Sequence, residues 1–157
     1  MNRIFIIGLM TSLICIQGQN QLFVGTRPLS MGGAFIALAD DANTITWNPA
    51  GLPRLRRTEF TTTYADLYFM GITQSYIGIV RPFGDRLALG MDWANVGFDD
   101  DELGYADNKL NFSFGYQPHK MISFGGTLKY IFKDMTLDGT SYGKSSGIGY
   151  DVGLLIS

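Results

Sequence analysis

Few side chains in this sequence have the types and spacing that catalysis or metal binding requires. His119 is the single histidine and Cys15 the single cysteine, and no Ser-His-Asp, Cys-His or metal-ligand spacing surrounds either of them. The acidic run Asp99–Glu102 could bind calcium or a basic partner, but it lacks the spaced Gly and Glu of a calcium loop. We interpret that run as a solvated loop. The sequence therefore predicts no enzyme of these kinds, no cofactor and no metal site.

The most informative pattern is a run of small and apolar residues between residues 25 and 52. Thr26 is a fair helix N-cap, and Pro28 is tolerated in a first helical turn, so residues 29–39 are expected to form one short helix. Gly32 and Gly33 lower the helix propensity of this segment by about 1 kcal/mol each relative to Ala. Because small residues allow close approach, we expect both glycines to lie against another surface, such as the inside of a barrel wall.

The second half of this run ends in an Asn-Pro-Ala-Gly turn. Asp40 and Asp41 are badly placed for a helix C-terminus, but they suit the N-cap of a second short turn over residues 42–46. An alternative is a polar latch, in which Asp40, Asp41 and Asn48 bind Arg or Lys on the wall. Asn48 precedes Pro49 and can close an Asx-turn on its own backbone, and Ala50 and Gly51 complete the turn.

The composition favours a β-barrel in a membrane over a soluble all-β protein. The chain has 157 residues, with 20 Gly, 11 Phe, 8 Tyr and 2 Trp, and only 17% of its residues are charged. Beyond the N-terminus no apolar run approaches the roughly 20 residues that a membrane helix needs. Many aromatic residues and few charges fit strands that alternate lipid-facing and lumen-facing side chains. A net charge of −2 gives no indication of nucleic acid binding.

The N-terminus is predicted to be a signal peptide over residues 1–18. Arg3 gives it a positive start, and residues 4–16 form an apolar core too short to span a bilayer comfortably. A lipoprotein needs a small residue directly before its cysteine, and Ile14 precedes Cys15, so we reject that alternative. Cleavage near Gly18 would leave a mature chain without cysteine and therefore without disulfides.

From residue 57 onward the hydrophobic period changes to two. The cleanest strand is residues 110–117, in which Leu110, Phe112, Phe114 and Tyr116 share one face. Six strands are predicted in all, over residues 58–68, 72–81, 86–96, 110–117, 121–132 and 148–156. Each is close to the roughly 10 residues of a tilted transmembrane strand.

The predicted connections alternate in length. Residues 82–85 and 118–120 form short turns, whereas residues 97–107 and 133–147 are predicted to be long polar loops. Short periplasmic turns and long external loops are typical of outer-membrane barrels. Six strands are fewer than the roughly eight of the smallest single-chain barrels, and an open sheet edge is not tolerated in lipid. We therefore expect the N-terminal part of a longer protein or a truncated gene product; assembly of several copies is the alternative.

Charged and aromatic residues on the predicted strands suggest further roles. Arg54, Arg56 and Arg57 are interpreted as an interfacial charge cluster, with contact to anionic lipid or a periplasmic partner as the alternative. The residues that could tune passage, if they face the lumen, are Asp92, Lys129 and Asp151. The aromatic side chains expected at the membrane interface or against lipid are those of Tyr64, Tyr68, Trp93, Tyr116 and Tyr130.

Several stretches of the sequence resemble a known family. They are Gly25-Thr26-Arg27, residues 31–35, residues 39–42, Trp47-Asn48-Pro49-Ala50-Gly51-Leu52, residues 81–85 and residues 151–155. This pattern resembles the N-terminal motif of outer-membrane proteins in the long-chain fatty acid transporter (FadL-like) superfamily, closest to its PorV/PorQ branch. The resemblance implies a barrel of about 14 strands closed by an N-terminal hatch, in which Asn48, Pro49 and Ala50 match the Asn-Pro-Ala motif of the transporters.

The resemblance implies a fold and two candidate functions. The expected fold is all-β: a partial antiparallel outer-membrane barrel over residues 57–157, preceded by a helical hatch over residues 19–56. PorV-like relatives capture exported proteins within a secretion machine, so the expected partners are membrane lipid, secretion-system components and exported proteins. The alternatives are a channel for hydrophobic small molecules such as fatty acids, or a structural protein of the outer membrane.

Overall fold

The computed structural model describes residues 24–67, 69, 71–99, 103–137 and 140–156. The predicted signal peptide, the first residues of the predicted hatch, Tyr68 and residues 100–102 of the acidic run lie outside this description. Within it, short helices precede a sheet that contains six strands. The helices are α2 (Thr26–Ser30), α3 (Phe35–Leu38), α4 (Thr44–Trp47) and the 3-10 helix η1 (Pro49–Arg54). The strands are β1 (Glu59–Leu67), β2 (Ile72–Phe83), β3 (Leu87–Asp99), β4 (Leu103–His119), β5 (Ile122–Leu137) and β6 (Thr140–Ile156).

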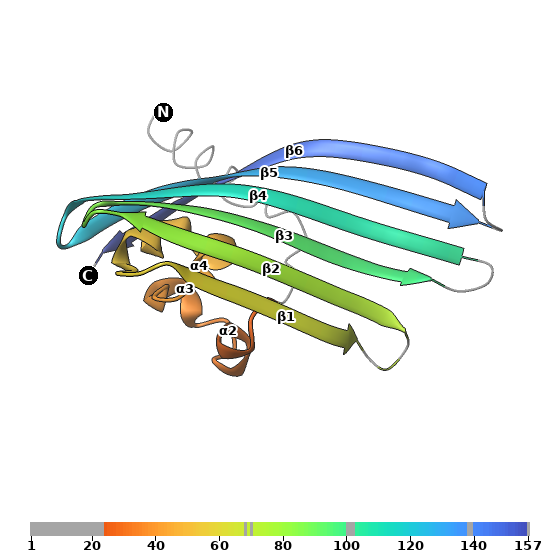
Figure 1. The fold of residues 1–157 in the computed structure, drawn as a ribbon, viewed down its shortest axis with the longest axis horizontal. Helices are drawn as coiled ribbons and strands as arrows, with labels where there is room; N and C mark the ends of the chain where they lie inside the picture. The colour runs from red at the N-terminus through yellow and green to blue at the C-terminus, as the bar shows by residue number, and fades with distance from the viewer. Residues whose placement is uncertain (1–23, 68, 70, 100–102, 138–139, 157) are drawn as a thin grey trace, which may run out of the picture.

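The sheet is an antiparallel meander in which every strand pairs with its neighbour in the chain (Figure 1). The fold is therefore all-β, as the period-two pattern predicted. The sheet is not closed, because in the described part of the chain β1 pairs only with β2 and β6 only with β5. The register pairs Gly115 of β4 with Gly125 of β5, and Gly125 with Gly153 of β6, so these three residues form one row across the sheet.

The predicted long loops were wrong. β3 runs on to Asp99 and β4 begins at Leu103, whereas β5 runs to Leu137 and β6 begins at Thr140. Most of residues 97–107 and 133–147 is therefore paired strand, and the predicted alternation of short and long connections is not found. The physical reason is that the hydrophobic alternation marks only the part of a strand whose two faces differ in polarity. The backbone hydrogen bonds between strands do not need this alternation and continue through polar and Gly-rich segments.

The predicted single helix over residues 29–39 was also wrong. α2 ends at Ser30, α3 begins at Phe35, and the turn between them contains Gly32 at φ 61° and Gly33 at φ 81°. Left-handed backbone of this kind is costly for residues with a Cβ and easy for glycine. The two glycines therefore break the helix, although their helix propensity alone would have allowed it to continue at a cost.

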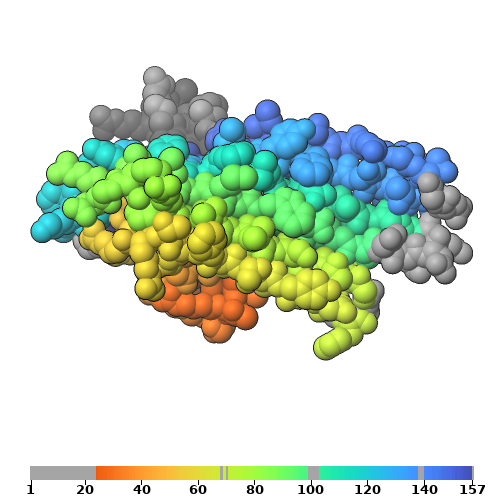
Figure 2. Space-filling model, viewed as in Figure 1, coloured from red at the N-terminus to blue at the C-terminus, as the bar shows by residue number. Residues whose placement is uncertain are grey.

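The helical residues 24–56, here called the hatch segment, lie against one face of the sheet. A buried core forms between them, with Ile45, Leu52 and Leu55 from the hatch segment and Val80 and Ala88 from β2 and β3. Figure 1 places the hatch segment near the end of the sheet that carries the β2–β3 and β4–β5 turns. In Figure 2 the strands hide most of the hatch segment, which emerges only past β1. The described part of the predicted hatch, residues 24–56, is thus docked on the sheet rather than separate from it.

Candidate functional site

The two faces of the sheet carry opposite kinds of side chain. Along β4, Asn111, Ser113 and Gly115 are buried, whereas Phe112 and Phe114 between them are each 48% exposed. We call the face that the hatch segment covers the inner face, and the opposite one the outer face. A water-soluble sheet buries its aromatic residues and exposes Asn and Ser. This sheet has the reverse arrangement.

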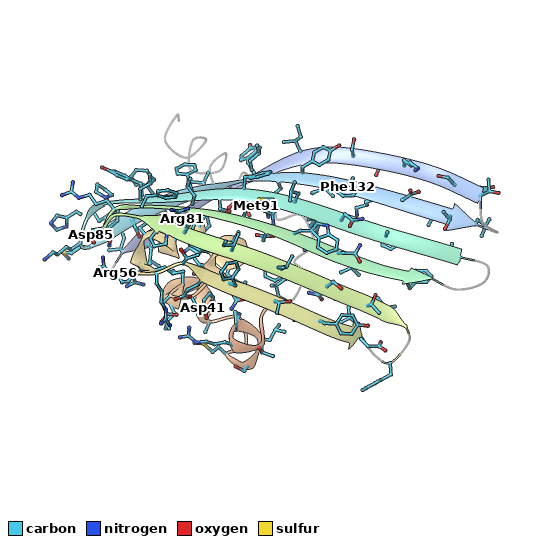
Figure 3. The ribbon with its side chains drawn as sticks, viewed as in Figure 1. Asp41, Arg56, Arg81, Asp85, Met91 and Phe132 are labelled. Atoms are coloured by element: carbon cyan, nitrogen blue, oxygen red, sulfur yellow. The ribbon has the colours of Figure 1, made fainter. Side chains whose placement is uncertain are left out.

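The outer face is apolar on all six strands. Its exposed side chains include Phe60, Tyr64, Ile77, Ile79, Leu89, Met91, Trp93, Phe112, Phe114, Phe124, Leu128, Tyr130, Phe132, Ile148, Tyr150, Val152 and Leu154. On β5 these positions run from Ile122 to Phe132, close to the roughly 9–11 residues of a tilted membrane-spanning strand. Beyond Phe132 the outer positions hold Asp134 and Thr136, so the apolar band ends there; Figure 3 labels Met91 and Phe132 within it.

Asn48 joins two parts of the hatch segment. Its Oδ1 accepts a hydrogen bond from the backbone N–H of Ala50 at 3.1 Å, which closes the predicted Asx-turn at the start of η1. Its Nδ2 donates to the carbonyl oxygen of Ile36 in α3 at 3.0 Å. Pro49 then follows at the first position of η1, where its missing N–H is tolerated. One buried side chain therefore holds α3 and η1 together.

Glycines of the inner face allow the Asn-Pro-Ala-Gly turn to touch the strand backbone. A Cβ on Gly115 would lie 2.7 Å from the carbonyl oxygen of Pro49, and one on Gly125 would collide with that same carbonyl. A Cβ on Gly153 would collide with Oδ1 of Asn48. Gly115, Gly125 and Gly153 are cross-strand neighbours, so β4, β5 and β6 present a bare strip of backbone to the turn. We call these three residues the glycine row.

Gly51 has a similar role inside the hatch segment. A Cβ at this position would collide with the carbonyl oxygen of Ala39 and lie 2.9 Å from Cγ2 of Thr44. The predicted contact of Gly32 and Gly33 with the wall was wrong. Among the described residues, no atom lies within 4 Å of a Cβ built on Gly32, and a Cβ built on Gly33 meets only the Trp47 ring, at 3.5 Å. These two glycines serve the turn between α2 and α3.

Asp40 and Asp41 bind an arginine of the hatch segment itself. Nη1 of Arg27 donates to Asp40 at 2.7 Å and to Asp41 at 2.8 Å. The hydrogen bonds from the guanidinium lower the pKa of Asp40 below its ordinary value of 3.8 and raise that of Arg27. Asp41 also accepts from the backbone N–H of Asn43 at 2.8 Å and so caps the following turn. In the described part of the chain these two carboxylates form no latch to the strands. Asp41 caps the turn, and both carboxylates close α2 onto it through Arg27.

Other side chains fasten the hatch segment to the sheet. Thr46 and Tyr76 of β2 share a hydrogen bond of 3.1 Å between their hydroxyl groups. The hydroxyl of Thr61 on β1 donates to Oδ1 of Asn43 at 3.0 Å. Sequence reasoning had not connected Thr61 or Tyr76 with the hatch, because an isolated Thr or Tyr in a strand carries no distinguishing signal.

A row of charged and amide side chains crosses the inner face beyond the hatch segment. Asn111 donates to buried Asp92 at 2.7 Å, and Ser113 and Thr127 share a hydrogen bond of 2.7 Å. Lys129 pairs with Asp151 at 2.5 Å. Asp92, Lys129 and Asp151 therefore lie on the inner face. Further along the strands Lys133 pairs with Asp107 at 3.1 Å.

Other candidate chemistry is not assembled in the described residues. His119 lies exposed at the end of β4, where its Nδ1 accepts from the backbone N–H of Met121 at 3.3 Å. Nowhere in the described part of the chain do three His, Cys, Asp or Glu side chains gather as a metal site would need. None of the helices in the described ranges is long and apolar enough to cross a membrane.

Comparison with known proteins adds no relative. No family model matches the sequence, and neither the curated proteins nor the solved structures contain a match. The candidate site is therefore defined by geometry alone. The hatch segment packs on the glycine row of the polar inner face, and the opposite, outer face of the same sheet is apolar.

Proposed function

We propose that this chain forms part of a β-barrel wall in an outer membrane, with the hatch segment plugging the lumen. The observation that supports the proposal most directly is the inverted sheet, whose Phe, Leu, Ile and Tyr side chains are exposed on the outer face while Asp92, Asn111 and Thr127 are buried on the inner one. Lipid-facing strands show this alternation. In the proposal the edges of β1 and β6 pair with further strands, because the bilayer core offers no water to hydrogen-bond the backbone N–H and C=O groups of an unpaired edge.

Within this class, a role in protein export of the PorV/PorQ type fits better than a channel for fatty acids. A carrier of hydrophobic molecules needs an apolar pocket beside the hatch, whereas the inner wall beyond this hatch segment carries Asp92, Asn111 and Lys129. The signal peptide and outer-membrane location belong to the same proposal, as do lipid, secretion components and exported proteins as partners. In this proposal the chain binds and passes on protein and is not an enzyme.

The lipid-facing role is tested by placing a charge on the outer face. Leu128 is 56% exposed, so Leu128→Arg should cost almost nothing in a water-soluble protein. Facing lipid near the middle of a bilayer, the arginine should cost about 2–4 kcal/mol. The measurement is the urea midpoint of the protein folded in phosphatidylcholine bilayers. Leu128→Met is the control and should leave the midpoint unchanged; an equal midpoint for Leu128→Arg would contradict a lipid-facing sheet.

The export role is tested in the native host by deleting the gene. Loss of exported proteins from the cell surface, with uptake of a radiolabelled long-chain fatty acid unchanged, is the expected result. Loss of fatty acid uptake with a normal surface proteome would instead support the hydrophobic channel. Complementation with the intact gene should restore the missing phenotype and serves as the control.

A further inference from the structure

Basic side chains gather at the end of the sheet that carries the β2–β3 and β4–β5 turns. Arg56 and Arg57 lie just before β1, separated from it by Thr58. Arg81 lies near the end of β2, Arg86 precedes β3, and Lys120 lies between β4 and β5. Five cations from four separate chain segments thus meet at one end, and we call them the basic collar. Figure 3 shows Arg56 and Arg81 at this end, together with Asp85.

The collar retains a net positive charge after its ion pairs are counted. Arg56 pairs with Asp85 at 3.4 Å, and Arg57 with Glu59 at 3.6 Å, in contacts that are largely exposed. Among the described residues at this end, these two carboxylates face five cations. Arg54 is not a member, because its guanidinium donates to the carbonyl oxygen of Leu38 within the hatch segment.

The collar borders the apolar outer face directly. Arg81 is an exposed residue of that face, and its guanidinium carbon lies 5.2 Å from the centre of the Phe83 ring. Phe83 and its cross-strand partner Leu87 are 46% and 38% exposed, and Ile122 at the same end of β5 is 43% exposed. A long side chain at the margin of a lipid-facing band places its stem on the apolar surface and its charge at the level of the lipid headgroups.

We propose that the basic collar binds the phosphate groups of anionic phospholipids in the leaflet that surrounds this end of the barrel. The inference rests on the proposed membrane-spanning function. Guanidinium groups match phosphate oxygens geometrically, and cations near an anionic leaflet are attracted to it. An acidic protein partner fits less well, because Arg81 projects beside Phe83 on the lipid-facing side rather than from the tip of a turn.

The test measures lipid binding to the full protein by native mass spectrometry in detergent, with phosphatidylglycerol and phosphatidylcholine as probes. Phosphatidylglycerol should bind more tightly, and the double variant Arg81→Gln/Arg86→Gln should raise its Kd roughly fivefold for each cation removed. The variant Asp85→Asn, which removes a competing carboxylate from Arg56, should lower that Kd. Lys133→Gln/Lys144→Gln removes the same charge near the opposite end of the strands and should leave the Kd unchanged.

The outcomes separate this inference from the function on which it rests. The same protein is first inserted into nanodiscs of pure phosphatidylcholine, which needs a lipid-facing sheet but no anionic lipid. Insertion together with equal Kd values for the two lipids would overturn the collar proposal and leave the barrel standing. An equal effect of the two double variants would also overturn it, because general charge would then explain the binding. Failure to insert would contradict the barrel and the collar together.

Discussion

At the scale of single residues, the docking of the hatch segment depends on glycines, which have no side chain to keep it away from the strands. The glycine row lets the backbone of Pro49 and Ala50 and the side chain of Asn48 approach the strands to a distance that a methyl group would prevent. Asn48 was recognisable from the sequence, because Asn before Pro has a specific local chemistry. The role of the glycine row was not recognisable from the sequence, since it depends on the strand register that brings the three residues together.

Gly153→Ala should weaken the docking of the hatch segment. The new methyl group would collide with Oδ1 of Asn48, and overpacking of this kind costs typically about 1–3 kcal/mol. Hydrogen exchange at the Ala50 amide, which donates to that oxygen, should accelerate. Gly149→Ala is a matched control on the same strand and face. The added Cβ would lie 3.6 Å from Cβ of Lys129, its nearest described neighbour, which is an ordinary van der Waals contact. Equal exchange in both variants would mean that the close contact does not hold the hatch.

At the scale of elements, the hatch segment has two halves that are held differently. Residues 43–54 contact the sheet through Ile45, the Asn-Pro-Ala-Gly turn and the Thr46–Tyr76 hydrogen bond. Residues 26–38 are joined to that half by the bonds from Asn48 to Ile36 and from Arg54 to Leu38, and by the edge-to-face contact of the Phe35 and Trp47 rings. Arg27 joins them to Asp40 and Asp41, which lie between the two halves. Substitutions in the two halves are therefore expected to have separable effects.

Gly33→Leu should loosen the turn between α2 and α3 without undocking η1. The residue has φ 81°, where a side chain costs roughly 1–2 kcal/mol, and a Cβ built on it lies within 4 Å of no atom of the described strands. Exchange should accelerate for amides of residues 31–39 and stay unchanged at Ala50. Gly33→Asn should be milder, because Asn tolerates this conformation better. Faster exchange at Ala50 in the Leu variant would show that the halves are coupled.

Acidification should release the contact between Arg27 and Asp40. The guanidinium lowers the pKa of Asp40, so its stabilisation is complete above the ordinary value of 3.8 and is lost as pH falls through the lower folded value. Amides of residues 26–38 should then exchange faster, relative to the intrinsic rate at each pH, at pH 2.5 than at pH 6. In Arg27→Gln the difference should shrink, whereas Arg56→Gln at the distant collar should behave as the unmodified protein. A pH response that survives Arg27→Gln would assign it to another group.

At the scale of the whole molecule, the chain is organised along the strand direction. The basic collar lies at one end, the apolar outer band follows, and paired strands with polar outer positions such as Asp134 continue beyond it. These extensions take the place of the predicted loops. In the proposed barrel they project from the membrane on the side opposite the collar.

This orientation can be read by labelling single cysteines on intact cells. A cysteine replacing Ser141, near the start of β6, should react with a membrane-impermeant maleimide, whereas one replacing Lys120 should not. Both should react after lysis, which controls for burial of either site. Cys15 lies in the predicted signal peptide, so the mature protein should give no background. The reverse pattern would place the collar on the cell surface.

The sequence by itself determined the class of the sheet, the two-sided character of its strands and the chemistry of the Asn48 turn. Those properties are local, since side-chain alternation and an Asn-Pro pair act within a few residues. The tertiary structure decided that residues 97–107 and 133–147 are mostly strand, that Gly32 and Gly33 serve a turn, and that Asp40 and Asp41 bind Arg27. It also decided which glycines face the hatch segment, because register, and not sequence neighbourhood, brings Gly115, Gly125 and Gly153 into one row.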